Sequence, residues 1–264
     1  MKSFKGFNTN QLKYWALVFM FLDSLFFSFP GVFPTWIHLI TRFVAPLFAF
    51  FTVEGFFHSS NRKNHLKRLW LAAGLMQLGN FLSYLLLGPV YQITDNIFLT
   101  LALGYSVIFL FETGKSKSTD RFLFYLAGLL LFISGLIFSV LPIIIGSYSF
   151  GVEGGIQVLF TMLIFWAFYG NRQKQVLVFL LWNLLLLALM GPDFNISQAP
   201  SFAAWFANFC YNSDSLTFLF LPFIYLYNGK KGSKKPIHKW IFYIFYPLQF
   251  WLLHLLAFLI HFSG

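Results

Sequence analysis

The sequence predicts an all-α, polytopic membrane protein, a bundle of about nine transmembrane helices, and three observations carry this prediction. Of the 264 residues, 58% are hydrophobic and only 10% are charged, whereas roughly 25% are charged in a typical soluble domain. Apolar stretches of about 20 residues, the length that crosses a hydrocarbon core, follow one another almost from end to end. Lys and Arg gather in short clusters between these stretches, as in the cytoplasmic loops of membrane proteins.

Apolar windows and the polar residues between them delimit nine expected spans, with eight or ten as the neighbouring counts. The expected spans are 12–30, 35–57, 66–87, 96–112, 121–141, 152–169, 175–191, 214–228 and 240–262. The eighth is the weakest of the nine. Residues 200–211 are too few to cross the bilayer, so they are expected to be interfacial, re-entrant or part of a span. The whole chain, 1–264, is expected to form one integral membrane domain.

Charge predicts how the chain is threaded. Every Lys and Arg except Arg42 lies at or before the start of the first span, or between an even-numbered span and the first residues of the next. Because cytoplasmic loops collect these residues, the amino terminus and the basic loops are expected in the cytoplasm, in a protein of the cell membrane. The charge of +10 is then explained by topology and by the lipid bilayer as a partner, and no nucleic acid is expected. The opposite loops hold Asp95, Glu153, Asp193 and Asp214.

Three charged residues lie more than two residues inside an expected span, where a charge costs at least about 2.5 kcal/mol unless it is paired or faces a cavity. They are Asp23, Arg42 and Glu54. Asp23 and Arg42 each lie seven residues from the outer end of their span, at similar depth in adjacent helices. We therefore expect them to form a pair. That pair is either a structural ion pair or part of a polar active cavity.

Several histidines lie near these charges. His58 follows Glu54 by four residues, so the two share a helix face and form either a proton-transfer pair or an ordinary helix end. His254 in the last span is expected to be buried and neutral, bonded to a neighbouring helix. His38, one turn from Arg42, is expected at the outer interface. No His, Cys, Asp and Glu grouping has metal-site spacing, so no metal is expected.

The loop YNGKKGSKKP, residues 227–236, sets two glycines beside four lysines. It contains no P-loop pattern. Its charges are explained either by topology and contact with anionic lipid or by an anionic cytoplasmic cofactor bound at Lys230 and Lys231.

Motifs along the whole chain resemble the TraX family. The second-span pattern R-x-x-x-P-x-F-A-F-x-x-V-E-G-F-x-H is the most specific of them, and it begins at Arg42 and ends at His58. The remaining motifs are Leu22-Asp23, Asn96 to Gly104, Tyr227 to Gly232 and Tyr246-Pro247-Leu248.

This resemblance implies a membrane acyltransferase, since the family takes its name from a conjugation protein that acetylates the amino terminus of pilin. The donor would be acetyl-CoA or another acyl-CoA, and the acceptor a secreted peptide or an envelope component. Arg42 would contact the oxyanion or the donor, Glu54 would be the base or its orienter, and Asp23 would hold its neighbour. With the residues singled out above, the candidate positions are then completed by His58 and His254 in catalysis and by Asn96, Lys230 and Lys231 in donor binding.

The chain departs from the family pattern at two positions. The family reads LDH in the first span and YPLH in the last, where this chain has Ser24 and Gln249. Neither side chain can accept a proton near neutral pH, so the usual general-base assignment fails at both. His254 is five residues beyond Gln249 and faces about 140° away around the helix.

Three classes of function therefore stay open. The first is a TraX-like acyltransferase, active or catalytically degenerate. The second is a non-enzymatic scaffold or partner-binding protein in which Asp23, Arg42 and Glu54 form a structural network. The third is a transporter or lipid-handling protein, for which intramembrane charges are also expected, although the sequence has no internal repeat.

Overall fold

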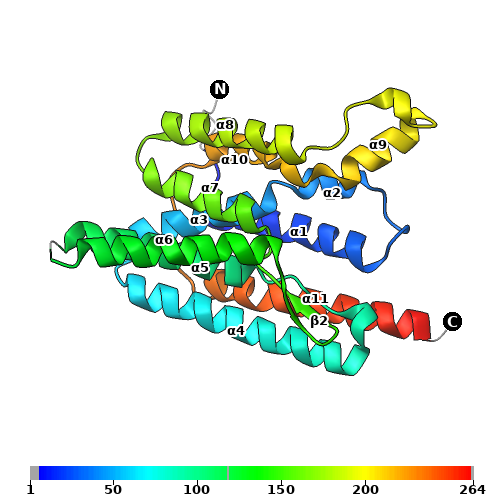
Figure 1. Ribbon diagram of the computed structural model, residues 1–264, viewed down its shortest axis with the longest axis horizontal. Coiled ribbons are helices and arrows are strands. Elements are labelled where there is room, and N and C mark those ends of the chain that lie inside the picture. The colour runs from blue at the N-terminus through cyan, green and yellow to red at the C-terminus, as the bar shows by residue number, and fades with distance from the viewer. Residues whose placement is uncertain (1–5, 118, 263–264) are drawn as a thin grey trace. The chain divides into compact units, whose positions relative to one another are not determined.

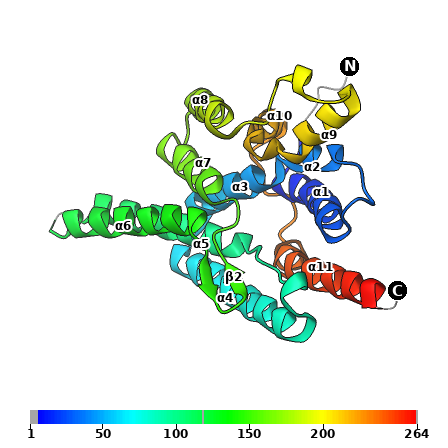
Figure 2. The same ribbon diagram turned by 45° about the vertical axis from the view of Figure 1, so that its right-hand side comes forward.

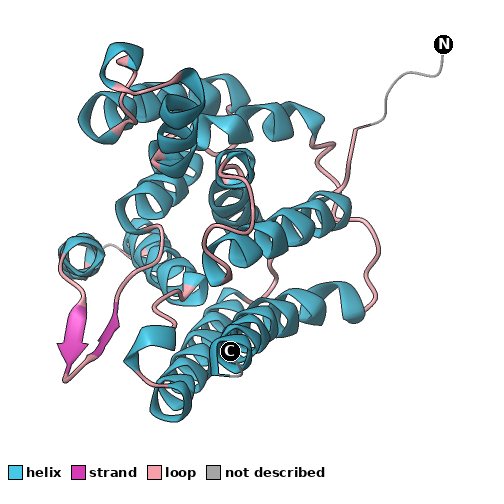
Figure 3. Cartoon of the chain, turned by 90° about the vertical axis from the view of Figure 1, so that its right-hand side faces the viewer, coloured by secondary structure: helices cyan, strands magenta, loops and turns pink. Residues whose placement is uncertain are grey.

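The computed structural model describes residues 6–117 and 119–262, and it is nearly all helical apart from one short β-hairpin (Figure 3). The described residues group into two compact units. Unit 1 comprises Met1–Phe48 and Arg172–Ala257, and unit 2 comprises Ala49–Asn171 and Phe258–Gly264. Lys2 and Lys5, which contribute to the charge pattern, lie outside the described residues.

Unit 1 contains the first helices of the chain and most of the last one (Figure 1). Its elements are α1 (Thr9–Ser28), α2 (Trp36–Thr41), the start of α3 (Val44–His58), α8 (Arg172–Met190), η2 (Ile196–Gln198), α9 (Phe202–Tyr211), η3 (Ser213–Ser215), η4 (Thr217–Phe220), α10 (Leu221–Leu226) and most of α11 (Ile237–Phe262).

Unit 2 holds the rest of α3 and the central helices. Its elements are α4 (Arg62–Leu87), η1 (Pro89–Tyr91), α5 (Ile97–Ser116), α6 (Arg121–Val140), β1 (Ile143–Ile145), β2 (Tyr148–Phe150) and α7 (Gly155–Ala167). α5 packs against α4, α6 and α7, and most of its residues are buried (Figure 2).

Within residues 6–117 and 119–262, six helical segments are long and apolar enough to cross a membrane, so the chain is a multi-pass membrane protein. They are Trp36–His58, Arg62–Leu87, Ile97–Ser116, Arg121–Val140, Arg172–Met190 and Ile237–Ile260. Two shorter apolar segments, Gly155–Ala167 and Thr217–Leu226, coincide with the sixth and eighth expected spans. With α1, these segments correspond one to one with the nine expected spans, and the number that crosses the membrane stays a prediction.

The helix break between α2 and α3 shapes the candidate site. Pro46 lies in the first turn of α3 and has no backbone N–H, so it cannot bond the carbonyl of Arg42 as a continuous helix would require. The N–H of Arg42, which would bond the carbonyl of His38 in a continuous helix, bonds the carbonyl of Leu39, at 3.3 Å. The carbonyl of His38 is thereby released from the helical ladder and becomes available to side chains.

The start of α1 is held by the basic loop. Backbone N–H groups of Thr9 and Asn10 donate to the carbonyls of Lys230 and Lys231, at 2.9 and 3.3 Å. Gly232, at φ +85°, supplies a left-handed conformation that a residue with a Cβ rarely adopts. The loop therefore satisfies helix-end donors that would otherwise lack partners.

Candidate functional site

Five polar side chains of unit 1 meet between α1, α2 and η3 and form the candidate site. Asp23 comes from the middle of α1, His38 and Thr41 from α2, Arg42 from the helix break and Asp214 from η3. The predicted pairing of Asp23 with Arg42 is confirmed, since Arg42 Nη2 lies 2.7 Å from Asp23 Oδ2. We call these five residues the Asp–His–Arg cluster.

Arg42 organises the cluster, because its guanidinium contacts four partners at once, the fourth being the Thr41 hydroxyl at 3.1 Å from Nη2. Nη2 donates to Asp23, Nη1 lies 2.5 Å from Asp214 Oδ1, and Nε donates to the carbonyl of His38 at 2.9 Å. The side chain is 15% exposed. The planar guanidinium of Arg presents several N–H donors in fixed directions, which the single ammonium group of Lys does not. The helix break makes the third contact possible, because it frees the His38 carbonyl.

His38 lies between the two carboxylates and is buried within unit 1, while its expected depth at the outer interface of the membrane stays a prediction. Its side chain is 2% exposed, with Nδ1 3.0 Å from Asp23 Oδ1 and Nε2 3.3 Å from Asp214 Oδ1. The rings of Phe26 and Phe27 enclose it, with centroids at 5.6 and 4.9 Å. Hydrophobic pattern alone cannot show this burial, since it comes from aromatic residues of another helix.

The electrostatics of the cluster are nearly balanced. Partial burial on its own would raise the pKa of Asp214, but hydrogen bonding with His38 and the charge of Arg42 outweigh it, so the pKa lies below its usual value. With His38 protonated, two cations face two carboxylates; with His38 neutral, the cluster carries one negative charge. An imidazole held by one carboxylate and bordered by a second can exchange a proton, which is the basis of general acid–base chemistry.

Ser24 and Gln249, which replace the family histidines, are both buried. The Ser24 hydroxyl donates to the Met20 carbonyl of its own helix, at 3.0 Å. Gln249 is 4% exposed, and neither end of its amide has a hydrogen-bond partner among the described residues. Neither residue can replace the missing base.

Glu54 and His58 belong to unit 2 and form the expected pair on one face of α3. His58 Nδ1 is 3.6 Å from Glu54 Oε2 and 2.9 Å from the Glu54 carbonyl. The His58 ring is 63% exposed and also approaches the Tyr169 hydroxyl, at 3.5 Å. Their chemical role stays a prediction.

The other predicted positions have structural partners. His254 Nδ1 contacts the carbonyl of Phe250 in its own helix, at 2.9 Å, which differs from the expected bond to a neighbouring helix. Asn96 caps α5, and its amide nitrogen donates to the Ala73 carbonyl and to Gln77, both at 3.1 Å. The backbones of Lys230 and Lys231 hold α1, while their side chains are exposed.

Sequence reasoning alone did not identify His38, Thr41 and Asp214 as members of the site. His38 precedes Arg42 by four residues, and this spacing, which puts two residues on one helix face, could have indicated that His38 belongs to the site. No local pattern could indicate Asp214, because 172 residues separate it from Arg42. Only tertiary folding brings η3 to α2.

Comparisons with known proteins agree with the motifs. The model of the TraX protein family matches residues 8–259. The chain is also 28% identical over 263 residues to the "Probable fimbrial assembly protein FimC, serogroup H1" of Dichelobacter nodosus, covering 94% of each chain. No solved structure matches it. Because the family model matches nearly its whole length, this chain belongs to the TraX protein family.

Proposed function

We propose that this protein is a membrane acyltransferase that moves an acyl group from acyl-CoA to an amine or hydroxyl of a peptide or envelope acceptor. The observation that carries the proposal is the contact of His38 with Asp23 beside Arg42, at 3.0 and 2.7 Å from the same carboxylate. An imidazole oriented by a carboxylate, with a guanidinium next to it, is a set of groups suited to acyl transfer.

In this proposal His38 takes over the base role of the family histidines that Ser24 and Gln249 replace. Asp23 fixes the ring through Nδ1, as an orienting carboxylate does in other base-assisted reactions. Asp214, whose side chain is 65% exposed, would give way to the acceptor at Nε2. Because Asp214 lies in a short 3₁₀ turn rather than inside a long helix, it is the member of the cluster best suited to move.

The reaction then balances as follows. His38 Nε2 accepts the proton of the acceptor amine or hydroxyl as that atom bonds to the thioester carbonyl carbon. The carbon–sulfur bond breaks, and the imidazolium returns the proton to the departing thiolate. In this scheme the positive charge of Arg42 steadies the oxyanion that forms between these two events.

The acceptor is proposed from the relatives. The family model and the similarity to a fimbrial assembly protein favour a pilin-like peptide over a sugar or a lipid. The exposed amine of such a peptide would be the acylated group. Assistance in pilus assembly is then the biological setting we propose for the reaction.

The test uses the purified full-length protein in lipid nanodiscs, labelled acetyl-CoA and a synthetic peptide with a free terminal amine. Transfer is expected, and His38→Gln should lower kcat by at least about 100-fold. His65→Gln is the matched control, because that ring contacts Tyr105 in unit 2 and is outside the cluster. Transfer that survives His38→Gln would rule out the proposed base.

A second function is favoured by one specific observation: every charge in the cluster already has a partner within it. That arrangement also suits a non-enzymatic scaffold. A scaffold predicts no thermal stabilisation by acetyl-CoA, whereas the enzyme predicts stabilisation that Arg42→Ala abolishes. Absence of stabilisation, together with no transfer after Ser24→His and Gln249→His are combined, would favour the scaffold.

A further inference from the structure

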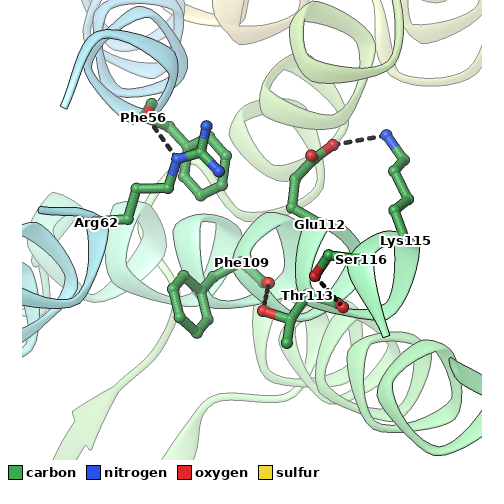
Figure 4. Close-up of a pocket in the computed structure, with 7 residues that line it drawn as sticks. All are labelled: Phe56, Arg62, Phe109, Glu112, Thr113, Lys115 and Ser116. Atoms are coloured by element: carbon green, nitrogen blue, oxygen red, sulfur yellow. Dashed lines mark hydrogen bonds and ion pairs between the residues drawn. The ribbon is translucent and has the colours of Figure 1, made fainter. Parts of the chain in front are cut away.

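A second polar site lies in unit 2, at the ends of helices that the charge pattern predicts to be cytoplasmic. It is a pocket of about 350 Å³ between the end of α3, the start of α4 and the last turns of α5. This volume falls at the small end of the range for ligand sites. Phe56 and Phe109 form its apolar walls, and Arg62, Glu112 and Lys115 supply its charges (Figure 4).

Arg62 is anchored in a way that leaves its outer nitrogens available. Nε donates to the Phe56 carbonyl at 3.2 Å, and the guanidinium carbon lies 4.4 Å from the centre of the Phe56 ring. Among the described residues, neither terminal nitrogen of Arg62 has a hydrogen-bond partner. A stacked guanidinium with two free amino groups is prepared to bind a phosphate through two parallel hydrogen bonds.

Glu112 and Lys115 form the other side of the pocket. Lys115 Nζ lies 2.6 Å from Glu112 Oε1, which also accepts from Trp166 Nε1 at 2.9 Å. Lys115 further lies over the Trp166 ring, at 4.4 Å from its centre. Both partners of Glu112 contact Oε1 and, within the described residues, Oε2 has no hydrogen-bond partner, so the pocket offers one acceptor oxygen opposite the guanidinium (Figure 4).

We propose that this pocket binds a phosphate ester that carries a hydrogen-bond donor, an amine or a hydroxyl, beside the phosphate. Arg62, stacked on the buried Phe56 ring, takes the phosphate, Glu112 Oε2 accepts from the donor, and Phe109 contacts the apolar part. The headgroup of phosphatidylethanolamine and the ribose phosphate of a nucleotide share this chemistry. The pocket shares no residue with the Asp–His–Arg cluster, and ligand binding there does not depend on the proposed acyl transfer.

Binding is measured on the full-length protein in detergent with adenosine 3′,5′-bisphosphate, and in nanodiscs by native mass spectrometry with phosphatidylethanolamine or with phosphatidylcholine, whose headgroup has no hydrogen-bond donor. Saturable binding of at least one of these donor-bearing ligands is expected. Arg62→Gln should weaken it by at least about tenfold. Lys63→Gln, which removes an exposed charge next in sequence, should change it less than about twofold. Nucleotide binding identifies a soluble ligand, and selective retention of phosphatidylethanolamine identifies a lipid.

Glu112→Gln gives the sharper test, because the amide oxygen can still accept from Trp166. It should strengthen binding of inorganic phosphate, since a negative charge is removed, and weaken binding of the donor-bearing ligand. Arg62→Lys, which keeps the charge and loses the fork, should fall between the wild type and Arg62→Gln. The proposal is overturned if neither ligand binds, or if Arg62→Gln and Lys63→Gln have equal effects in proteins of unchanged melting temperature.

Discussion

At the scale of single residues, Arg42 is the one cation that topology does not explain, and its contacts supply the explanation. It joins carboxylates from α1 and η3 to the backbone of α2. A buried ion pair contributes little net stability compared with apolar residues, but removal of one partner leaves an uncompensated charge. The cluster is therefore a place where single substitutions have large effects.

Arg42→Ala is expected to destabilise the protein by about 3 kcal/mol, because Asp23 loses its strongest partner. Arg42→Lys should have a smaller effect, since Lys keeps the charge but cannot bridge both carboxylates. The measurement is thermal or denaturant unfolding in detergent. Lys63→Ala is the control, with an expected change within about 0.5 kcal/mol. Equal stability of the Arg42 and Lys63 variants would contradict a paired cluster.

Asp214 predicts a pH dependence of stability. Its folded pKa is lowered, so the native state favours its ionised form. The contribution is present above the unfolded pKa, near 3.8, and it is lost as pH falls through the lower folded value. Asp214→Asn should therefore lower the melting temperature at pH 7 and flatten its decline below about pH 5. Parallel acid profiles for the two proteins would refute this assignment.

At the scale of elements, small residues allow α5 and α6 to approach closely. A Cβ added at Gly128 of α6 would lie 2.5 Å from Cε1 of Phe111 in α5. Phe111 is itself held between Tyr125 and Trp166, with ring centroids at 5.6 and 5.4 Å. Membrane helices commonly use small residues in this way, because association depends on close packing.

Gly128→Ala is expected to destabilise the protein by about 1–3 kcal/mol through overpacking, because the Phe111 ring would have to shift against Tyr125 and Trp166. Gly74→Ala in α4 is the matched control, since a Cβ there meets nothing within 4 Å. That change should be neutral or stabilising by up to about 1 kcal/mol. Melting temperatures of both variants in the same detergent decide the question, and equal shifts would argue against tight α5–α6 contact.

At the scale of the whole molecule, the charge pattern and the helical segments lead to a testable threading. Nine spans with the amino terminus in the cytoplasm require Asn195 and Lys231 to lie on opposite sides, with one span between them. Asn195 and Lys231 are both exposed. The single cysteine, Cys210, is buried and can be replaced by Ala to give a clean background for labelling.

In that background, Asn195→Cys should react with an impermeant maleimide in right-side-out vesicles, and Lys231→Cys only in inverted vesicles. The physical reason is that Lys and Arg are retained on the cytoplasmic side. Permeabilised vesicles serve as the control for access. Labelling of both positions from one side would mean that 214–228 does not cross the membrane.

The sequence by itself determined the all-helical membrane class, the family and the Asp23–Arg42 pair, because hydropathy, charge and depth within a span each depend on short stretches of sequence. It also located the short segment that became α9. Only the tertiary structure decided that His38 is buried between Asp23 and Asp214. The reason is that Phe26 and Phe27, which pack on His38, lie in another helix, and that η3, which holds Asp214, comes from a distant part of the chain.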